Sequence, residues 1–284
     1  MSEAMLDCAV VGGGPAGLSA AINLHQRGKS VRVLGAGAGL LAKAERVDNY
    51  LGLPGQTGAE LVGTFRAHAE ELGTDFVTGR AISLMAWNGF MVTVGSQVYD
   101  GQALILAPGV VRQAKYPGEA EFLGRGVSYC ATCDGMLYRK RPVTVVGRSK
   151  DAPLEANYLQ SIGCQVIYVS AREPEGLDPA IPWVRAGKLA VKGDQTVTAL
   201  EADGADLPCA GVFILREAVA PTDLLPDLET EGGFIRVDRR MATNLEGVFA
   251  AGDCTGLPLQ VAKAVGEGHV AALSACEYLD RKQP

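Results

Sequence analysis

A glycine-rich segment near the start of the chain recurs, in altered form, near its middle. Residues 9–17 read Ala-Val-Val-Gly-Gly-Gly-Pro-Ala-Gly, and residues 144–152 read Thr-Val-Val-Gly-Arg-Ser-Lys-Asp-Ala. The same spacing maps the apolar run 31–34 onto the run 166–169 without a gap. Each copy predicts a short buried strand, a glycine turn, a helix and a second strand, which together form a βαβ unit. Two such units in one chain predict an α/β fold.

The rest of the chain indicates how the two units are connected. Residues 103–107 form an apolar run that ends in Pro-Gly, residues 248–251 form another, and the Ala-rich segment 260–279 is helical in character. Because these elements lie on both sides of the second copy, we expect two Rossmann-like domains of the FAD/NAD(P)-binding type, the second inserted in the first. The expected domains are 1–114 with 243–284, and 115–242, with linkers near 112–117 and 240–244.

The composition excludes several other classes of protein. Hydrophobic residues make up 48% of the chain and charged residues 20%, which is typical of globular domains, and the net charge of −6 argues against a nucleic-acid-binding face. Residues 1–7 contain no Lys or Arg, which a secretion signal needs. The uncharged stretch 8–24 is broken by glycines and a proline, so it is a poor membrane span. We therefore expect a cytoplasmic protein that binds neither nucleic acid nor membranes.

The first glycine loop matches G-x-G-x-x-G between a strand and a helix. Gly12 would permit the tight turn, Gly14 would let the backbone approach a pyrophosphate, and Gly17 would let helix and strand pack closely. Pro15 and Ala16 would open the helix, whose N-terminus attracts anions. A purely structural glycine turn is the alternative. The acidic residue that usually holds the ribose is missing, since Gly-Ala-Gly-Ala-Gly stands at 35–39.

A second candidate for the same ligand lies far along the chain. Gly252 and Asp253 end a predicted strand. An Asp at this place can accept a hydrogen bond from a polyol such as the ribityl chain of a flavin, although a helix-capping Asp is the simpler alternative. Together with the first loop, this Asp favours FAD over NAD in the first domain.

The second copy of the loop has lost most of the residues that bind a dinucleotide. Ser149 replaces the second glycine, charged residues follow it, and Ala152 stands at the third position, where alanine is an accepted variant. The position after the second strand reads Ser-Ala-Arg-Glu (170–173), which is a weak match to a site for a 2′-phosphate. We interpret this as a degenerate site. An atypical working site, with Arg148 and Lys150 holding phosphate, is the alternative.

Two of the seven cysteines form a close pair, Cys130-Ala-Thr-Cys133, followed by Asp134. A structural zinc site needs four ligands, but the chain has no second C-x-x-C and its three histidines are scattered, so we expect no metal. A reversible disulfide is the natural alternative. Asp134 could exchange protons beside it, or could be a solvated turn residue. A flavin would supply the electrons that a redox dithiol needs.

On these motifs the chain resembles the low-molecular-weight thioredoxin reductases, a family of flavin disulfide reductases. The matching segments cover almost the whole chain: residues 12–17, Asp-Asn-Tyr-Leu-Gly at 48–52, Cys-Ala-Thr-Cys-Asp at 130–134, and Gly252-Asp253 with Gln260. The resemblance implies FAD as cofactor, thioredoxin as partner and a homodimer.

The resemblance also implies roles for individual residues. Cys133 would face the flavin, Cys130 would exchange with the partner's disulfide, and Asp134 would be the acid/base. Asp253 would bind the ribityl chain. The remaining FAD contacts would come from Asn49 and from the backbone of Gln260 and Val261.

Where NADPH-dependent members bind NADPH, this chain departs from the family pattern. Residues 147–152 and 170–172 lack the glycines and the His-Arg-Arg of those members, and this resembles the ferredoxin-dependent flavin thioredoxin reductases. An NADPH-dependent enzyme with an atypical loop stays open, as does a flavin-bound redox sensor or dithiol oxidase. Ferredoxins are acidic, so a ferredoxin would dock on local positive charge. The sequence offers one basic cluster, which comprises Arg139, Lys140, Arg141, Arg148 and Lys150. The alternative is that this cluster is an ordinary solvated face.

Overall fold

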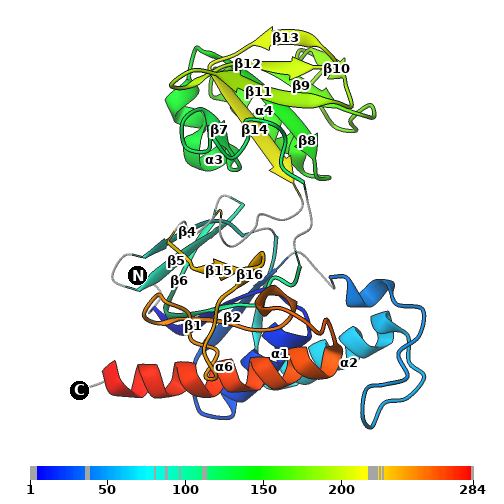
Figure 1. Ribbon diagram of the computed structural model, residues 1–284, viewed down its shortest axis with the longest axis vertical. Helices are drawn as coiled ribbons and strands as arrows, with labels where there is room; N and C mark the ends of the chain where they lie inside the picture. The colour runs from blue at the N-terminus through cyan, green and yellow to red at the C-terminus, as the bar shows by residue number, and fades with distance from the viewer. Residues whose placement is uncertain are drawn as a thin grey trace. The chain divides into compact units, whose positions relative to one another are not determined.

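The computed structural model divides the chain into two compact units, shown in Figure 1. The first unit comprises 1–111 and 218–284, and the second comprises 112–217. Each unit is built around a mainly parallel sheet, so the predicted α/β fold class is confirmed. The structure describes residues 5–35, 39–79, 81–86, 89–95, 97–110, 114–216, 223, 225 and 227–282.

The first unit contains a seven-stranded sheet in the order β3-β2-β1-β6-β5-β4, with β17 also paired to β6. The first half of β6 pairs antiparallel with β5, and its second half pairs parallel with β1 and β17. The carboxyl ends of β1 and β17 therefore lie at the same edge of the sheet. The strands are β1 (Leu6–Val11), β2 (Val31–Gly35), β3 (Asp75–Thr78), β4 (Ala81–Ala86), β5 (Phe90–Val94), β6 (Gln97–Leu106) and β17 (Val248–Ala250).

Two helices of the first unit, α1 (Pro15–His25) and α6 (Val261–Lys282), lie side by side (Figure 1). They approach closely because small residues face each other: a Cβ added to Gly268 would lie 2.1 Å from the carbonyl oxygen of Ala16. Their alanines pack with β1, β2 and β6 in one core. The unit also contains α2 (Gly58–Glu71), which starts with a capping box, and the short helices η1 (Leu41–Lys43) and η3 (Asp253–Thr255).

The second unit contains a parallel sheet in the order β10-β9-β8-β14-β7. Its core is formed by β8, β9, β14 and the helix α4. A three-stranded antiparallel sheet, β11-β12-β13, belongs to the same unit. The elements are β7 (Val127–Ser128), α3 (Ala131–Asp134), η2 (Gly135–Tyr138), β8 (Pro142–Arg148), α4 (Ala152–Ser161), β9 (Gln165–Ser170), β10 (Trp183–Arg185), β11 (Leu189–Gly193), β12 (Val197–Ala202), β13 (Ala205–Pro208) and β14 (Gly211–Arg216).

The chain returns from the second unit to the first at residue 218, which is earlier than the sequence predicts. We expect residues 115–242 in the second domain, but residues 218–242 group with the first unit. The reason lies in contacts with the first unit: Ala242 bridges to Phe249, the side-chain amide of Asn244 donates to the carbonyl of Asp227 at 2.8 Å, and Met241 packs on the first core. This segment also contains the hairpin β15 (Thr230–Glu231) and β16 (Phe234–Ile235). Of the expected first linker, residues 112 and 113 lie outside the described residues.

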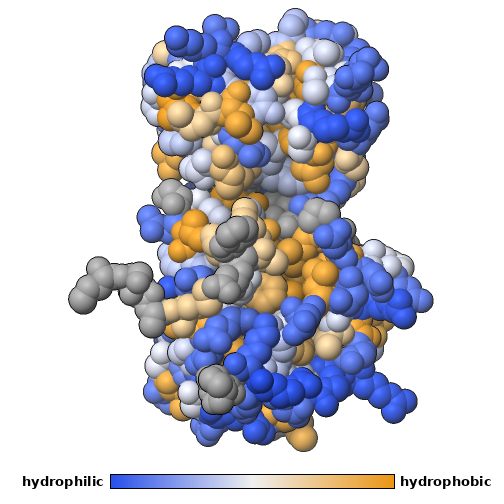
Figure 2. Space-filling model, turned by 90° about the vertical axis from the view of Figure 1, so that its left-hand side faces the viewer, coloured by the Kyte–Doolittle hydropathy of each residue, from blue (hydrophilic) through white to orange (hydrophobic). Residues whose placement is uncertain are grey.

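Both units carry mostly hydrophilic residues with smaller apolar patches on the face seen in Figure 2. Within the described part of the chain, no helix combines the length and apolar character that crossing a bilayer requires.

Candidate functional site

The first glycine loop lies between β1 and α1, and two of its glycines are needed for packing. Gly12 has φ +116°, and a Cβ there would lie 2.1 Å from the carbonyl oxygen of Ala107 on the neighbouring strand end. A Cβ on Gly17 would lie 1.9 Å from the carbonyl oxygen of Gly12. Any side chain at these two positions would therefore collide with backbone, so the loop can form only with glycine there.

Gly14 differs from its two neighbours because a Cβ added to it would meet nothing within 4 Å. Gly14 is the N-cap of α1 and makes no side-chain cap, and Pro15 follows as the first helical residue. Open space therefore lies beside Gly14 at the start of α1, where the first amides of a helix have no partner within it and the helix dipole favours an anion. The loop thus fits the pyrophosphate of a dinucleotide such as FAD, with Ala16 buried beneath it.

Replacing Gly14 by valine tests this interpretation. We expect Gly14→Val to fold, since its side chain points into open space, but to bind FAD about tenfold or more weakly, because hydrogen bonds to a charged group are lost. The flavin content of the purified variant and its dissociation constant for FAD measure the effect. Gly17→Val is the contrasting variant, and its collision with backbone should lower the melting temperature. Normal FAD affinity in Gly14→Val would argue against a phosphate at this loop.

Three of the other predicted FAD residues gather near the same edge of the sheet. The side-chain amide of Asn49 donates to Oε1 of Gln260 at 2.8 Å, although 211 positions separate them in the sequence. Gln260 directly precedes Val261, the first residue of α6. Gly252, at φ +87°, follows β17, and a Cβ on it would lie 2.8 Å from Cβ of Ala16 in the glycine loop. The two halves of the predicted FAD site therefore adjoin each other.

Asp253 follows Gly252 and begins η3. Its carboxyl group is half-buried, and burial raises its pKa; Lys263 acts in the opposite direction, and Glu267 adds to the increase. Of the ribose segment, residues 36–38 lie outside the described residues.

A polar cluster that the sequence analysis missed supports the Asp253 turn. Oε2 of Glu267 accepts hydrogen bonds from the amide of Gly252 at 2.9 Å and from the hydroxyl of Thr255 at 2.8 Å. Nζ of Lys263 donates to the same Glu267 oxygen at 3.0 Å and to the carbonyl of Gly252 at 2.9 Å. Lys263 and Glu267 are four residues apart on α6, and this spacing is the one local signal that could have indicated the pair.

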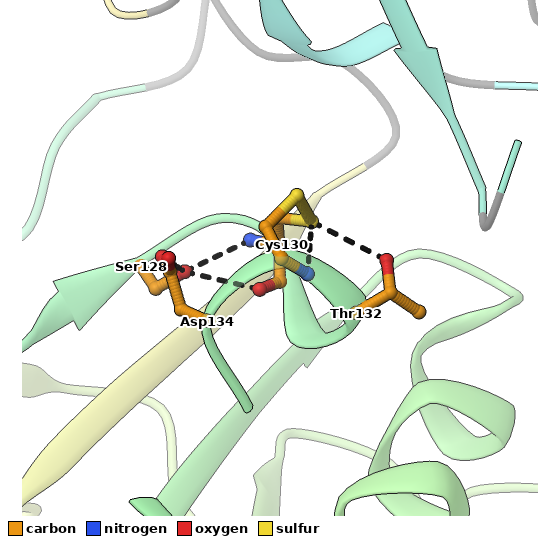
Figure 3. The surroundings of a disulfide bond; sticks show 5 residues. Ser128, Cys130, Thr132 and Asp134 are labelled. Carbon is orange, nitrogen blue, oxygen red and sulfur yellow. Dashed lines mark hydrogen bonds between the residues drawn. A yellow bond between two sulfur atoms is a disulfide. The ribbon is translucent and has the colours of Figure 1, made fainter. Parts of the chain in front are cut away.

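The predicted cysteine pair forms a disulfide at the start of α3, as Figure 3 shows. Cys130 is buried, with 3% exposure, whereas Cys133 is exposed. Sγ of Cys130 accepts the backbone N–H of Cys133 at 2.9 Å and lies 3.4 Å from the hydroxyl of Thr132. In the reduced state these donors would stabilise a thiolate on Cys130.

Asp134 connects to this disulfide indirectly. The hydroxyl of Ser128 donates to Oδ2 of Asp134 at 2.6 Å, and the amide of Cys130 donates to the same hydroxyl at 3.1 Å (Figure 3). Ser128 could not be predicted as part of the site, since a serine before a cysteine pair carries no signal of its own. Among the described residues, no group of three or more His, Cys, Asp or Glu is placed to hold a metal ion.

The second glycine loop differs from the first in its backbone as well as its side chains. Strand β1 ends before Gly12, whereas β8 continues through Gly147 and Arg148, which pair with Leu215 and Arg216 of β14. A Cβ on Gly147 would lie 1.8 Å from the hydroxyl of Tyr168, a buried residue of β9. Gly12 and Gly13 of the first loop therefore correspond to strand residues in the second copy, and Gly14 corresponds to Ser149, directly after the strand.

Comparison with known proteins agrees with this arrangement. The family model described as pyridine nucleotide-disulphide oxidoreductase matches residues 6–181 and 183–268. A crystal structure of a ferredoxin-flavin thioredoxin reductase from Clostridium acetobutylicum is 42% identical, with a TM-score of 0.89, covering 98% of this chain and 99% of that one. The thioredoxin reductase of Aquifex aeolicus is 32% identical over 99% of this chain and 95% of its own.

One further relative has a different name. The glucosaminate ammonia-lyase of Pseudomonas fluorescens is 35% identical over 96% of both chains. Overall identity alone therefore does not fix the type of reaction. The candidate site of this chain also holds the Cys130–Cys133 disulfide. With that disulfide, the glycine loop and the family match together, the chain belongs to the low-molecular-weight thioredoxin reductase family of the pyridine nucleotide-disulphide oxidoreductases.

Proposed function

We propose that this protein is a flavin-dependent disulfide reductase that passes electrons from reduced ferredoxin, through FAD and the Cys130/Cys133 dithiol, to thioredoxin. The observation that carries the proposal is the disulfide itself, in which the buried Cys130 sulfur accepts the amide of Cys133 and Cys133 is exposed. Two of the relatives reported above, from Aquifex aeolicus and Clostridium acetobutylicum, are named as thioredoxin reductases, which supports thioredoxin as the substrate. The expected homodimer and cytoplasmic location are part of the same proposal.

The residues that would hold FAD belong to the first unit. The open face of Gly14 and the first turn of α1, with Gly12, Pro15, Ala16 and Gly17, would receive the pyrophosphate. Asp253 would accept from the ribityl chain on a turn fixed by Glu267 and Lys263. The remaining contacts would come from the pair Asn49 and Gln260 and from the backbone of Val261. When bound, FAD supplies two-electron reduction of the disulfide and can accept single electrons from a donor.

The two cysteines would act in sequence. The exposed Cys133 would receive electrons from the flavin, which breaks the bond between the two sulfurs. Cys130, whose thiolate is stabilised by the amide of Cys133 and the hydroxyl of Thr132, would then attack the disulfide of thioredoxin. Attack by Cys133 on the resulting mixed disulfide would release reduced thioredoxin and restore the bond between Cys130 and Cys133. Asp134 would exchange protons with the thiols.

An apolar surface beside the disulfide supports a protein substrate. Met136 and Leu137 follow the cysteine pair after two intervening residues, and they are 57% and 70% exposed. Large apolar side chains that stay exposed next to a reactive group are typical of a docking surface. Thioredoxin would cover them during disulfide exchange.

Ferredoxin is proposed as the donor because of the second loop. Ser149 replaces a glycine, β8 continues through Gly147 and Arg148, and Tyr168 packs on Gly147, so little of a nicotinamide dinucleotide site remains. The similarity to the ferredoxin-flavin thioredoxin reductase of Clostridium acetobutylicum points in the same direction.

Anaerobic mixing of the purified flavoprotein with each donor tests the proposal. We expect reduced ferredoxin to bleach the flavin rapidly and to support thioredoxin reduction, while NADPH and NADH do neither. Rapid bleaching by NADPH would instead identify an NADPH-dependent enzyme with an atypical loop. No bleaching by any of the three would favour a redox sensor or a dithiol oxidase.

Ferredoxin docking should depend on salt if it uses the basic cluster. Lys140 and Lys150 are both exposed, and electrostatic steering of an acidic partner raises association rates by about tenfold or more at low ionic strength. We therefore expect Lys140→Glu with Lys150→Glu to slow flavin reduction by ferredoxin about tenfold at low salt. Arg185→Glu, an exposed reversal elsewhere in the same unit, is the control. If the rate of flavin reduction by ferredoxin responded to neither salt nor these charge reversals, this cluster would not be part of the docking surface.

A further inference from the structure

Ser128 occupies a position between the disulfide and the predicted acid/base residue. It is the last residue of β7, and only 4% of it is exposed. Its hydroxyl oxygen lies 2.6 Å from Oδ2 of Asp134, 3.1 Å from the amide nitrogen of Cys130 and 3.2 Å from the carbonyl oxygen of Cys130 (Figure 3). One buried hydroxyl therefore meets one donor and two acceptors.

A serine hydroxyl carries one proton and two lone pairs, so it cannot donate to both acceptors at once. When Asp134 is ionised, Ser128 donates to the carboxylate and accepts the N–H of Cys130. When Asp134 is protonated, the acid can donate to Ser128, and the serine proton can turn to the carbonyl of Cys130. Both charge states of the carboxyl group then keep all their hydrogen bonds, and no heavy atom has to move.

We propose that Ser128 is the positioning residue of the dithiol site, and that it holds Asp134 in one place in both protonation states and couples that state to the backbone of Cys130. This rests on the proposed role of Asp134 in thiol–disulfide exchange. In the step concerned, a departing thiolate takes the proton of the Asp134 carboxyl group, which leaves a thiol and a carboxylate. Ser128 keeps its own proton and only changes its acceptor.

One other titratable group responds to the same carboxylate. The pKa of Tyr138 is raised by burial and, to a smaller extent, by Asp134. Tyr138 stacks edge-on against Phe213 and lies on η2, directly after α3. Replacing Tyr138 by phenylalanine therefore gives a background in which the phenol cannot contribute to a titration.

A double-mutant cycle between Ser128 and Asp134 tests the proposal. The full-length flavoprotein is reduced and freed of excess reductant, and its reaction with bis(2-hydroxyethyl) disulfide, whose leaving thiolate must take up a proton, is followed against pH. Neither ferredoxin nor thioredoxin takes part in this reaction. The result can therefore be interpreted even if ferredoxin is not the donor or thioredoxin is not the substrate.

We expect Asp134→Asn to slow the exchange about 100-fold and to remove the limb of the pH profile that reports the ionisation of the Asp134 carboxyl group. Ser128→Ala should slow it about tenfold and move that limb to higher pH, because the ionised carboxylate loses a donor. In the Asp134→Asn background, Ser128→Ala should have no further effect, and Ser128→Thr should retain the limb. Ser161→Ala is the control, since it removes a serine hydroxyl of the same unit that donates to the carbonyl of Tyr158 within α4. Tyr138→Phe should leave the limb in place.

A second measurement needs no Ser128 variant. The amide chemical shift of Cys130 in the wild-type protein should titrate with the same midpoint as the Asp134 limb, and it should not do so in Asp134→Asn. Equal slowing by Ser128→Ala in both backgrounds, or a Cys130 amide that ignores the titration, would overturn the proposal.

Discussion

Cys133→Ser and Cys130→Ser should each bind FAD normally and lose thioredoxin reduction by at least about 1,000-fold. A serine hydroxyl cannot form the disulfide that stores the electron pair, and it is a far weaker nucleophile than a thiolate. The residues expected to bind FAD lie in the first unit, whereas both cysteines lie in the second, so flavin content should not change. Steady-state reduction of thioredoxin and the flavin absorbance of each variant measure the two effects.

Cys164→Ala is a suitable control for the cysteine variants. Cys164 is a free, buried cysteine of the same unit, and burial raises its pKa, so it is unreactive. The control should keep the wild-type rate. If either Cys130→Ser or Cys133→Ser still reduced thioredoxin at a rate close to wild type, the dithiol would not be on the electron path.

Glu119→Gln should destabilise the second unit by about 3–5 kcal/mol, because it leaves a buried arginine without its countercharge. Glu119 has no exposed surface, and only 8% of the Arg216 side chain is exposed. Oε2 of Glu119 accepts from Arg216 at 2.7 Å and from the amide of Tyr116 at 2.8 Å, and the hydroxyl of Tyr129 donates to Oε1 at 2.9 Å. Chemical denaturation, followed by a spectroscopic signal that reports on the second unit, measures the loss in the free energy of unfolding.

The pH dependence of stability should report the same ion pair. Burial alone raises the pKa of Glu119, but hydrogen bonds and the charge of Arg216 outweigh it, so the net pKa lies below the ordinary 4.5. The stabilisation is then complete above pH 4.5 and is lost as the pH falls through the lowered pKa. The double variant Glu119→Gln with Arg216→Met, which removes both charges, should recover part of the lost stability. Equal stability of Glu119→Gln and the wild type would show that the pair is not buried in solution.

Features set by local spacing could be predicted from the sequence. The turn at Gly12 and the close packing at Gly17 follow from a motif of a few consecutive residues, and in the structure a side chain at either position would collide with backbone. The Cys130–Cys133 disulfide follows in the same way. Asn49 and Gln260 were identified separately, through a resemblance, and the structure joins their side chains.

Features that depend on long-range contacts could not be predicted. The buried partner of Arg216 is 97 positions away, and nothing near Glu119 marks it as a charge to be buried. Ser128 acquires its significance only because the turn after Cys130 brings Asp134 back to it. The early return to the first unit depends on contacts such as the hydrogen bond from the side chain of Asn244 to the carbonyl of Asp227, which is 17 positions away in the sequence.

The most direct test of the central claim, that a flavin reduces the Cys130–Cys133 disulfide, is an anaerobic reductive titration of the purified protein. Flavin and disulfide are each reduced by two electrons. We predict that the wild-type protein takes up twice as many electrons per flavin as Cys130→Ser or Cys133→Ser before its absorbance is fully lost. A colourless protein, or equal electron uptake by the wild type and the variants, would contradict the claim.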